Sequence, residues 1–508
     1  MTATVAVRGA RGAASPAAVG IGLWIAAALV SGFTIRRSLE GFDEGFLLQA
    51  ATRIADGQWP WRDFGWPYGP GQPLVVAGAF KLLGPSVVWW RLLRVAVDAT
   101  TALLAWALVR ERAGNRLGLA AGAAAALTAA QPVSANAANT ALMLGLLAVW
   151  LASRARPGWA GAAAALAVFW RPDLGAAAAL AAAATAAWPR DAVAVRARPA
   201  LVALGAAAAG VLVLYAPFLV AVGPGTVFDA LVVQSTRDGA WWRLPFPAGY
   251  PGQLRAGHLA RDLKDVLGWL EPYVALAGSA LAVVVLGRRR AAPGLAILAL
   301  GCVAYLLSRA DELHAQLLLI VACPLLALAA AVAPRLPAVL LGVALALIAA
   351  GGLANRVSAL LRPPDLVAVH LPGVPGIGVP PAEARALPPL VALVDRLVGP
   401  GEPIYVAPRR SDLVTSTNPL VHFLVRRPNV LHRDVLLQAR PAEQHAIVVA
   451  LRRARPRVVV RWTSPQSAHP EPNPRGRPSG SRELDAYLAA AYRLRARFGD
   501  YDVLVPRG

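Results

Sequence analysis

The sequence of 508 residues contains very little lysine, cysteine or methionine. Lysine occurs only at Lys81 and Lys264, so arginine supplies nearly all of the 50 basic residues, which outnumber the 28 acidic ones. A formal net charge of +22 can indicate nucleic-acid binding. The arginines are instead spread between apolar runs and do not gather on one soluble module. We therefore predict that nucleic acid is not a partner.

The scarcity of cysteine excludes a disulfide framework. The two cysteines, Cys302 and Cys323, both lie inside apolar runs, where we expect them to be small buried hydrophobic residues. No Cys/His spacing typical of a metal site is present, and no internal repeat is found.

Long apolar runs dominate the first two thirds of the chain. Hydrophobic residues make up 57% of the sequence and the mean hydropathy is +0.52, which is typical of a polytopic α-helical membrane protein. The run lengths predict about eleven transmembrane helices. They are expected at 17–34, 88–109, 116–132, 137–153, 158–170, 174–189, 200–221, 270–287, 293–308, 314–333 and 336–353.

The distribution of arginine in short loops predicts the orientation. Arginines are frequent in the loops near 110–116, 154–156, 190–198 and 288–290, and sparse in the alternate loops. We expect a cytoplasmic N-terminus with an uncleaved signal anchor, in a multi-pass protein of the plasma membrane. The loops 35–87 and 222–269, and the whole chain after 354, are then extracytoplasmic.

The tail differs in character from the apolar region. Short apolar runs at 403–408, 457–462 and 501–506 predict strands, and the segments 442–454 and 481–498 predict amphipathic helices. We therefore expect a transmembrane domain at 1–354, a proline-rich linker at 355–389, and an extracytoplasmic α/β domain at 390–508.

An acidic pair, Asp43 and Glu44, directly follows the first apolar run. The simplest interpretation is helix capping, with Asp43 as N-cap and Glu44 in the first turn. Carboxylates at the membrane surface could also take a proton from a hydroxyl or bind a divalent cation.

An aromatic, proline-stiffened loop comes next, "WPWRDFGWPYGPGQP" from Trp59 to Pro73. Its aromatic residues could form an interfacial belt or stack on sugar rings. Further charges are predicted near the outer ends of the spans, where arginine or protonated histidine could hold a lipid phosphate. Together these observations predict substrate-binding residues at Asp63, Trp66, Tyr68, Arg91, Arg94, Arg171, Asp173, Arg309, Asp311 and His314.

The order of these elements over residues 17–110 resembles the GT-C superfamily of polyprenyl-phosphate-sugar-dependent glycosyltransferases, which includes protein O-mannosyltransferases and lipid A aminoarabinose transferases. The matching features are an acidic pair after the first span, a turn from Gly57 to Asp63, several prolines, and a second span with arginines near its start.

The resemblance implies an inverting transfer of a sugar from a polyprenyl-phosphate donor to an extracytoplasmic acceptor hydroxyl on a protein, a lipid or a polysaccharide. Asp43 would be the general base or would orient the hydroxyl, and Glu44 would assist it or ligate a divalent cation where one is used. Arg309, His314, Arg91 and Arg171 would hold the lipid phosphate. Two other classes stay open, namely a transporter or flippase of a lipid-linked or anionic solute, and a non-catalytic membrane scaffold.

Overall fold

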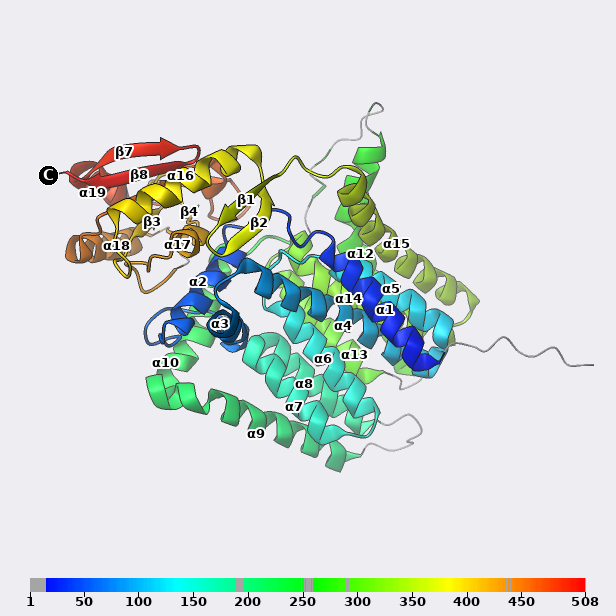
Figure 1. Cartoon of the computed structure of the whole chain (residues 1–508). Helices are drawn as coiled ribbons and strands as arrows, with labels where there is room; N and C mark the ends of the chain where they lie inside the picture. The colour runs from blue at the N-terminus through cyan, green and yellow to red at the C-terminus, as the bar shows by residue number, and fades with distance from the viewer. Residues whose placement is uncertain are drawn as a thin grey trace, which may run out of the picture.

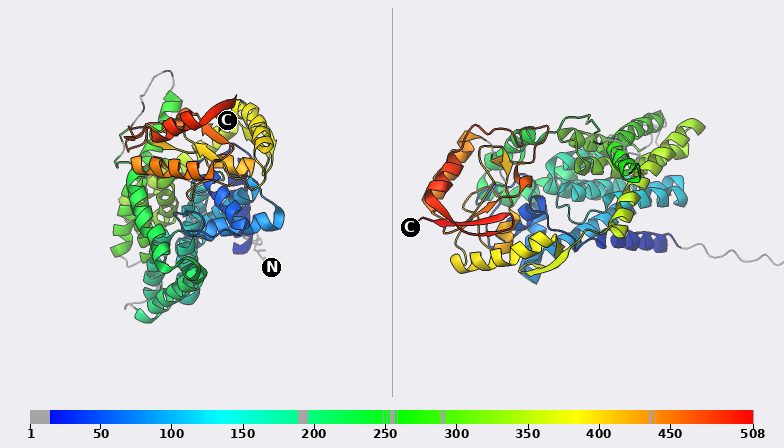
Figure 2. Two further views of the ribbon diagram at one scale, coloured as in Figure 1. Left: turned by 90° about the vertical axis from the view of Figure 1, so that its left-hand side faces the viewer. Right: turned by 90° about the horizontal axis from the view of Figure 1, so that it is seen from above.

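The computed structural model describes residues 15–188, 196–247, 249–250, 252, 257, 259–288, 292–434, 437–438 and 440–507. A bundle of helices forms one part of the molecule, and a smaller domain of strands and helices, built from the C-terminal third of the chain, covers one end of it (Figures 1 and 2). The described N-terminal helix lies in the bundle, with its first residues toward the opposite end (Figure 1).

Every predicted apolar run contains a helix. These helices are α1 (Pro16–Gly32), α4 (Val87–Ala113), α5 (Asn115–Ala129), α6 (Ala138–Ser153), α7 (Pro157–Trp170), α8 (Pro172–Ala187), α9 (Ala197–Val222), α12 (Leu259–Arg288), α13 (Pro293–Ser308), α14 (Glu312–Val332) and α15 (Arg335–Leu361). Of the described helices, α4, α9, α12, α14 and α15 are long and apolar enough to cross a membrane. The count of eleven spans is therefore not confirmed, although the polytopic helical class is.

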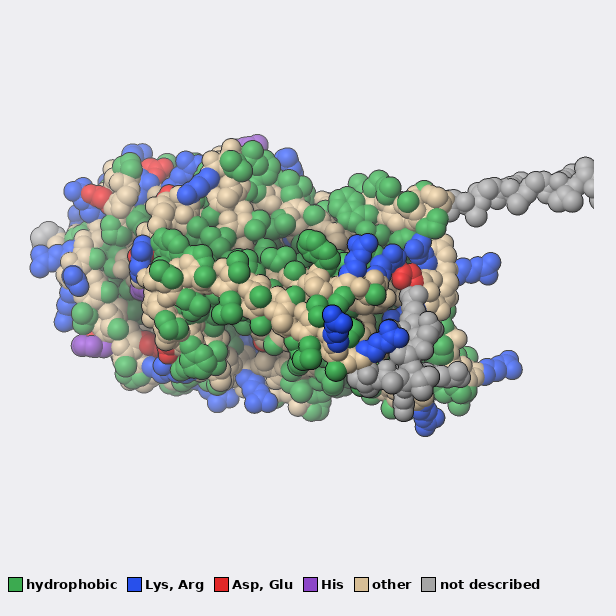
Figure 3. All heavy atoms as spheres, turned by 90° about the horizontal axis from the view of Figure 1, so that it is seen from below, with side chains coloured by type: hydrophobic (Ala, Val, Ile, Leu, Met, Phe, Trp, Pro, Cys, Tyr) green, Lys and Arg blue, Asp and Glu red, His purple; other side chains and the backbone are tan. Residues whose placement is uncertain are grey.

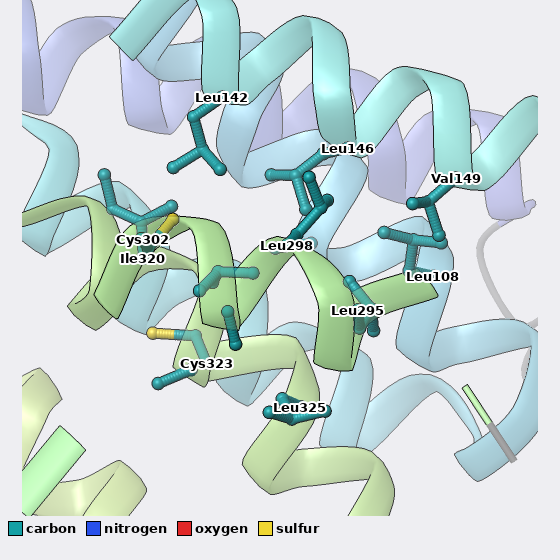
Figure 4. Close-up of a cluster of buried hydrophobic side chains, with 14 of the residues drawn as sticks. Leu108, Leu142, Leu146, Val149, Leu295, Leu298, Cys302, Ile320, Cys323 and Leu325 are labelled. Carbon is teal, nitrogen blue, oxygen red and sulfur yellow. The ribbon is translucent and has the colours of Figure 1, made fainter. Parts of the chain in front are cut away.

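Small side chains allow the helices of the bundle to pack closely. Alanines line the buried faces of α5, α6, α7 and α8, and leucines from α4, α6, α13 and α14 fill the space between them. Cys302 and Cys323 lie in this apolar cluster as free, buried thiols (Figure 4). The prediction that they are small buried hydrophobic residues is confirmed.

The predicted external loops carry short helices. The first loop contains α2 (Asp43–Ala55) and an unexpected apolar helix, α3 (Gly71–Leu83). The second loop begins with α10 (Pro224–Phe228), a π-helical turn at Asp229–Gln234 and α11 (Ser235–Trp242). Helix α2 is buried on most of its sides, because α3 and the C-terminal domain pack against it.

The C-terminal domain is built around a four-stranded mixed sheet in the order β3-β6-β8-β7, with β3 (Tyr405–Ala407), β6 (Val459–Trp462), β7 (Tyr492–Phe498) and β8 (Tyr501–Pro506). A second pair joins β4 (Thr415–Ser416) and β5 (Leu437–Gln438). The helices are α16 (Pro381–Leu397), α17 (Leu420–Val425), α18 (Pro441–Ala454) and α19 (Glu483–Ala491). The three predicted strands and the helix at 442–454 are confirmed.

Two sequence predictions in this region were wrong in detail. The helix expected at 481–498 ends at Ala491, because the segment Tyr492–Phe498 alternates apolar and arginine side chains with the period of a strand and pairs with β8. The expected linker contains the end of α15, the start of α16 and a hairpin of β1 (Val367–Leu371) and β2 (Val374–Val379). The domain boundaries themselves stay a prediction.

Candidate active site

A cavity of about 1250 Å³ lies where the helical bundle meets the C-terminal domain. The α1–α2 loop, the aromatic loop, the α7–α8 turn, α11, the α13–α14 turn, α15 and loops of the C-terminal domain line it. Eight predicted site residues share this lining: Asp43, Trp66, Tyr68, Arg171, Asp173, Arg309, Asp311 and His314. The fold thus brings together residues from four separate stretches of the chain.

Asp43 is the first residue of α2, and its side chain does not cap the helix. None of the described residues donates a hydrogen bond to its carboxylate, although the residue is half-buried in the cavity wall. Burial raises the pKa of Asp43 above its ordinary value, while His314 and Arg171 act in the opposite direction. Asp43 is therefore a carboxylate that faces the cavity and the cations across it.

Glu40 supplies the capping that the sequence suggested for Asp43. Its carboxylate accepts hydrogen bonds from the backbone N–H groups of Phe42 (2.8 Å) and Glu44 (2.7 Å), which fixes the first turn of α2. Burial and the negative charge of Asp43 raise the pKa of Glu40 to about 8. Sequence reasoning missed this residue because it precedes the helix by three positions.

Glu44, although adjacent to Asp43, points away from the cavity. Arg91 donates to both of its oxygens, at 2.7 Å and 2.8 Å, and both side chains are fully buried. Arg91 also donates to the carbonyls of Ile35 and Ser38, at 2.7 Å and 2.6 Å. The pair joins α4 to the segment that leads into α2, so the predicted contact of Arg91 with a phosphate is not supported by its position.

Arg94 and Asp63 also lie outside the cavity lining, contrary to their prediction as substrate-binding residues. Arg94 is buried and donates to Asp98 at 2.7 Å and to the carbonyls of Ser134 and Ala129. Asp63 pairs with Arg62 at the surface and accepts a hydrogen bond from the backbone N–H of Trp59. Their hydrogen bonds hold loops in place.

Arg171 enters the cavity from the turn between α7 and α8. Its guanidinium lies between two tyrosine rings, 5.0 Å from the centre of Tyr68 and 4.5 Å from that of Tyr305. Its Nε and Nη1 donate to Asp173 and Asn136, both at 3.0 Å. The hydrogen bonds of Arg171 to described residues use Nε and Nη1, so Nη2 can donate to a ligand.

The turn between α13 and α14 contributes a second charged group. Arg309 donates to Asp311 (2.6 Å), to the carbonyl of Trp242 (2.8 Å) and to Glu471 of the C-terminal domain (3.1 Å). Asp311 caps α14 through the backbone N–H of His314 and also contacts its Nδ1 at 2.7 Å. Although burial acts against it, the hydrogen bonds and charge of His314 hold the pKa of Asp311 below its ordinary value.

Aromatic side chains form much of the remaining wall. In the first loop, Trp66 is buried and donates to the carbonyl of Gly69, and Tyr68 packs edge-on against it. Trp241, Trp242 and Trp462 also line the cavity and were not predicted. The adjacent tryptophans Trp241 and Trp242 in the second external loop could have been predicted as site residues from the sequence. Trp462 lies in strand β6, and no sequence pattern indicates that it lines the cavity.

The C-terminal domain covers the cavity and contributes lining residues that the sequence did not single out. Gly45 allows α2 to approach α17 so closely that an ideal Cβ would lie 2.3 Å from the backbone nitrogen of Leu420. Asn418, Arg475 and Tyr501 of this domain line the cavity. Only the folded chain shows this proximity, because nearly 380 positions separate Gly45 from Leu420.

The helical bundle, the first external loop with its acidic pair and the C-terminal domain over the cavity together form a fold that this chain shares with solved structures of ArnT. The chain is similar to the crystal structure of ArnT from Cupriavidus metallidurans in the apo state, with 16% identity, a TM-score of 0.57, and coverage of 96% of this chain and 98% of ArnT. The structure of the same ArnT bound to undecaprenyl phosphate matches at 16% identity, a TM-score of 0.55 and the same coverage. No protein-family model and no curated protein matches the sequence.

Proposed function

We propose that this protein is a membrane glycosyltransferase that moves a sugar from a polyprenyl-phosphate donor to an extracytoplasmic acceptor hydroxyl with inversion. The observation that carries the proposal is the carboxylate of Asp43, which faces a cavity shared with Arg171, Arg309 and His314. The ArnT structure of the same fold binds undecaprenyl phosphate, which supports a lipid-linked donor.

The cationic side of the cavity suits the phosphate of the donor. Arg171 keeps a donor nitrogen for a ligand while its other nitrogens and the two tyrosine rings hold it in place. A guanidinium fixed in this way can bind a phosphate without a large loss of side-chain freedom. Arg309 and His314 line the same cavity, and both act to lower the pKa of Asp43.

Asp43 then acts on the acceptor. The acceptor oxygen attacks the anomeric carbon and forms the new glycosidic bond, while the bond from that carbon to the phosphate oxygen breaks. The hydroxyl proton passes to the carboxylate of Asp43, and the lipid phosphate leaves as an anion held by the cations. Because the leaving group is already a stabilised anion, positioning and electrostatic stabilisation supply most of the effect.

The residues do not fit a resident divalent cation. Within the described ranges, no three His, Cys, Asp or Glu side chains are grouped so that they could hold a metal ion. Glu44, the predicted ligand, is already paired with Arg91. The proposed steps therefore use the side chains of the protein alone.

The charge distribution supports an external position for the site. Arginine and lysine side chains lie toward both ends of the face shown in Figure 3, and hydrophobic side chains dominate this face between the two ends. With the arginine-rich short loops of the bundle in the cytoplasm, the cavity and the C-terminal domain would lie outside the plasma membrane, where a lipid-linked donor can enter from the bilayer.

The test replaces Asp43 with Asn and follows sugar transfer from a labelled polyprenyl-phosphate sugar in membranes that contain the full-length protein. We expect a loss of about 10²–10⁴-fold in rate, the usual contribution of a general base. Asp56→Asn at the exposed opposite end of α2 is the matched control and should retain transfer. Unchanged transfer by the Asp43 variant refutes the proposal, and movement of the donor across liposomes without transfer would instead support a flippase.

A further inference from the structure

A second pair of arginines lines another part of the cavity. Arg37 follows the end of α1, and Arg356 lies in the last turns of α15. Burial has the largest effect on the pKa of Asp43, and the charged groups that act on it most are His314, Arg171, Asp311 and Arg309, and not this pair. The two arginines therefore belong to a region that the proposed transfer does not use.

Among the described residues, neither arginine makes an ion pair. Within the described residues, the side chain of Arg37 donates only to the backbone carbonyl of Ala359, at 2.7 Å. The Nε of Arg356 is buried and has no hydrogen-bond partner in the described structure. Both guanidiniums lie over the ring of Phe33, at 5.3 Å and 6.0 Å from its centre, so their positive charges are close to each other.

This arrangement is unfavourable without an anion. Two neighbouring cations repel each other, and a buried N–H group without an acceptor costs free energy. Asp98 is the acidic residue whose charge acts on Arg356, and its carboxylate already accepts hydrogen bonds from Arg94 and Ser31. A phosphate group, with several acceptor oxygens and negative charge, would satisfy both arginines at once.

The backbone holds Arg37 in this position. Strand β2 pairs with the segment that follows α1, where Ser38 donates to the carbonyl of Gly378 at 2.7 Å and Gly378 donates to the carbonyl of Arg36 at 2.8 Å. The C-terminal domain thus fixes the chain around Arg37, so that little order has to be created when an anion binds.

The surroundings indicate that the anion belongs to a lipid. Helices α1 and α15 lie on either side of α5 (Figure 1) and expose large apolar side chains near the arginine pair. Leu29 of α1 is 69% exposed and Leu360 of α15 is 64% exposed. Acyl or prenyl chains can lie against such surfaces while the head group reaches the arginines at the level of the membrane interface.

We propose that Arg37 and Arg356 form a binding site for the phosphate group of a membrane lipid, separate from the charged groups around Asp43. The site recognises phosphate through two guanidiniums and recognises the lipid through the apolar faces of α1 and α15. It is independent of the proposed transfer, since it can bind lipid whether or not Asp43 acts as a base.

The experiment measures binding to the purified full-length protein in a neutral detergent by native mass spectrometry and thermal unfolding. The probes are dioctanoyl phosphatidate, farnesyl phosphate, inorganic phosphate, and dioctanoylglycerol as the phosphate-free match. We expect both lipid phosphates to bind and to raise the melting temperature. We expect dioctanoylglycerol not to bind, and inorganic phosphate to bind at least about tenfold more weakly, because it lacks the apolar contacts.

Arg37→Gln and Arg356→Gln should each weaken binding of dioctanoyl phosphatidate by about tenfold or more. Arg36→Gln, at an exposed neighbour outside the cavity lining, is the control with the same charge change and should bind normally. Without lipid, neither Arg37→Gln nor Arg356→Gln should lower the melting temperature below that of the wild-type protein, because each removes one of two cations that repel each other. Arg37→Lys and Arg356→Lys retain the charge and should bind with intermediate affinity.

Unchanged phosphatidate binding by both glutamine variants overturns the proposal. Inorganic phosphate binding as tightly as the two lipid phosphates overturns the assignment to a lipid and leaves a site for a free anion. Binding of dioctanoylglycerol at the same affinity as phosphatidate overturns the role of the arginines. If a glutamine variant fails to fold, the phosphatidate affinity of the lysine variant at that position replaces it as the test. If both lysine variants bind phosphatidate with wild-type affinity but melt at a lower temperature, the role of the arginines is purely structural and the proposal is overturned.

Discussion

The two adjacent acids of α2 should respond to the same chemical change in opposite ways. Glu44→Gln removes the negative charge that neutralises Arg91. Asp43→Asn removes a carboxylate that accepts no hydrogen bond from the described residues. Both substitutions replace a carboxylate by an amide of nearly the same shape. The difference between them therefore reports electrostatics and not packing.

The structure sets the expected magnitudes. Both partners of the Glu44–Arg91 pair are fully buried and are joined by two short hydrogen bonds, of 2.7 Å and 2.8 Å. Breaking a buried pair costs roughly 3–5 kcal/mol, because one charge stays buried without compensation. Glutamine keeps one acceptor oxygen, so we expect about 3 kcal/mol. For Asp43→Asn we expect a change within about 1 kcal/mol, and of stabilising sign, because a half-buried anion is removed.

The assay follows unfolding of the full-length protein in detergent by intrinsic tryptophan fluorescence, with sugar transfer measured on the same preparations. Asp43→Asn should unfold like the wild-type protein and lose transfer. Glu44→Gln should unfold much more readily, and the fraction that remains folded should retain transfer. A stable Glu44→Gln protein, or an unstable Asp43→Asn protein, would refute the assignment of Glu44 to the ion pair with Arg91 and of Asp43 to the cavity.

Three further predictions follow from the same geometry. Glu40→Ala should cost about 1 kcal/mol in a thermal melt and should lower transfer, since it removes the acceptor for two backbone N–H groups at the start of α2, and Glu40→Gln should restore part of both. The rate of transfer should fall on the acidic side of the pH–rate profile as the raised pKa of Asp43 is crossed, because a protonated base is inactive, and a profile that is flat from neutral to acidic pH would contradict the role of Asp43 as the base. Gly45→Ala should destabilise the protein by about 1–3 kcal/mol and lower the rate of transfer, because the added Cβ would force α2 away from Leu420 and displace Asp43. A Gly45→Ala protein that melts and transfers sugar like the wild-type protein would show that the close approach is not needed.

Several elements of the fold could be read from the sequence because they depend on local properties. Apolar runs predicted the positions of the eleven bundle helices named above, and short apolar runs at 403–408, 457–462 and 501–506 predicted three strands of the sheet. The same local reading failed at 481–498, where the change of period from helix to strand occurs at Tyr492 inside one continuous amphipathic segment.

The site was only partly predictable, for reasons that differ between residues. Asp43, Arg171, Arg309 and His314 could be suspected because the sequence predicts them at the extracytoplasmic ends of the spans, on one side of the membrane. Charge alone did not distinguish Arg171, which faces the cavity, from Arg91, which is paired with an acid. That distinction depends on which helix packs against each side chain.

The sequence by itself determined the membrane class, the helix positions and the presence of an acidic pair outside the first apolar run. Only the tertiary structure decided which acid faces the cavity. Successive residues of a helix point about 100° apart, so Asp43 faces the cavity that Arg171 and His314 also line, while Glu44 faces α4 and Arg91. Contacts between residues hundreds of positions apart placed the C-terminal domain over the site, and no local pattern encodes such contacts.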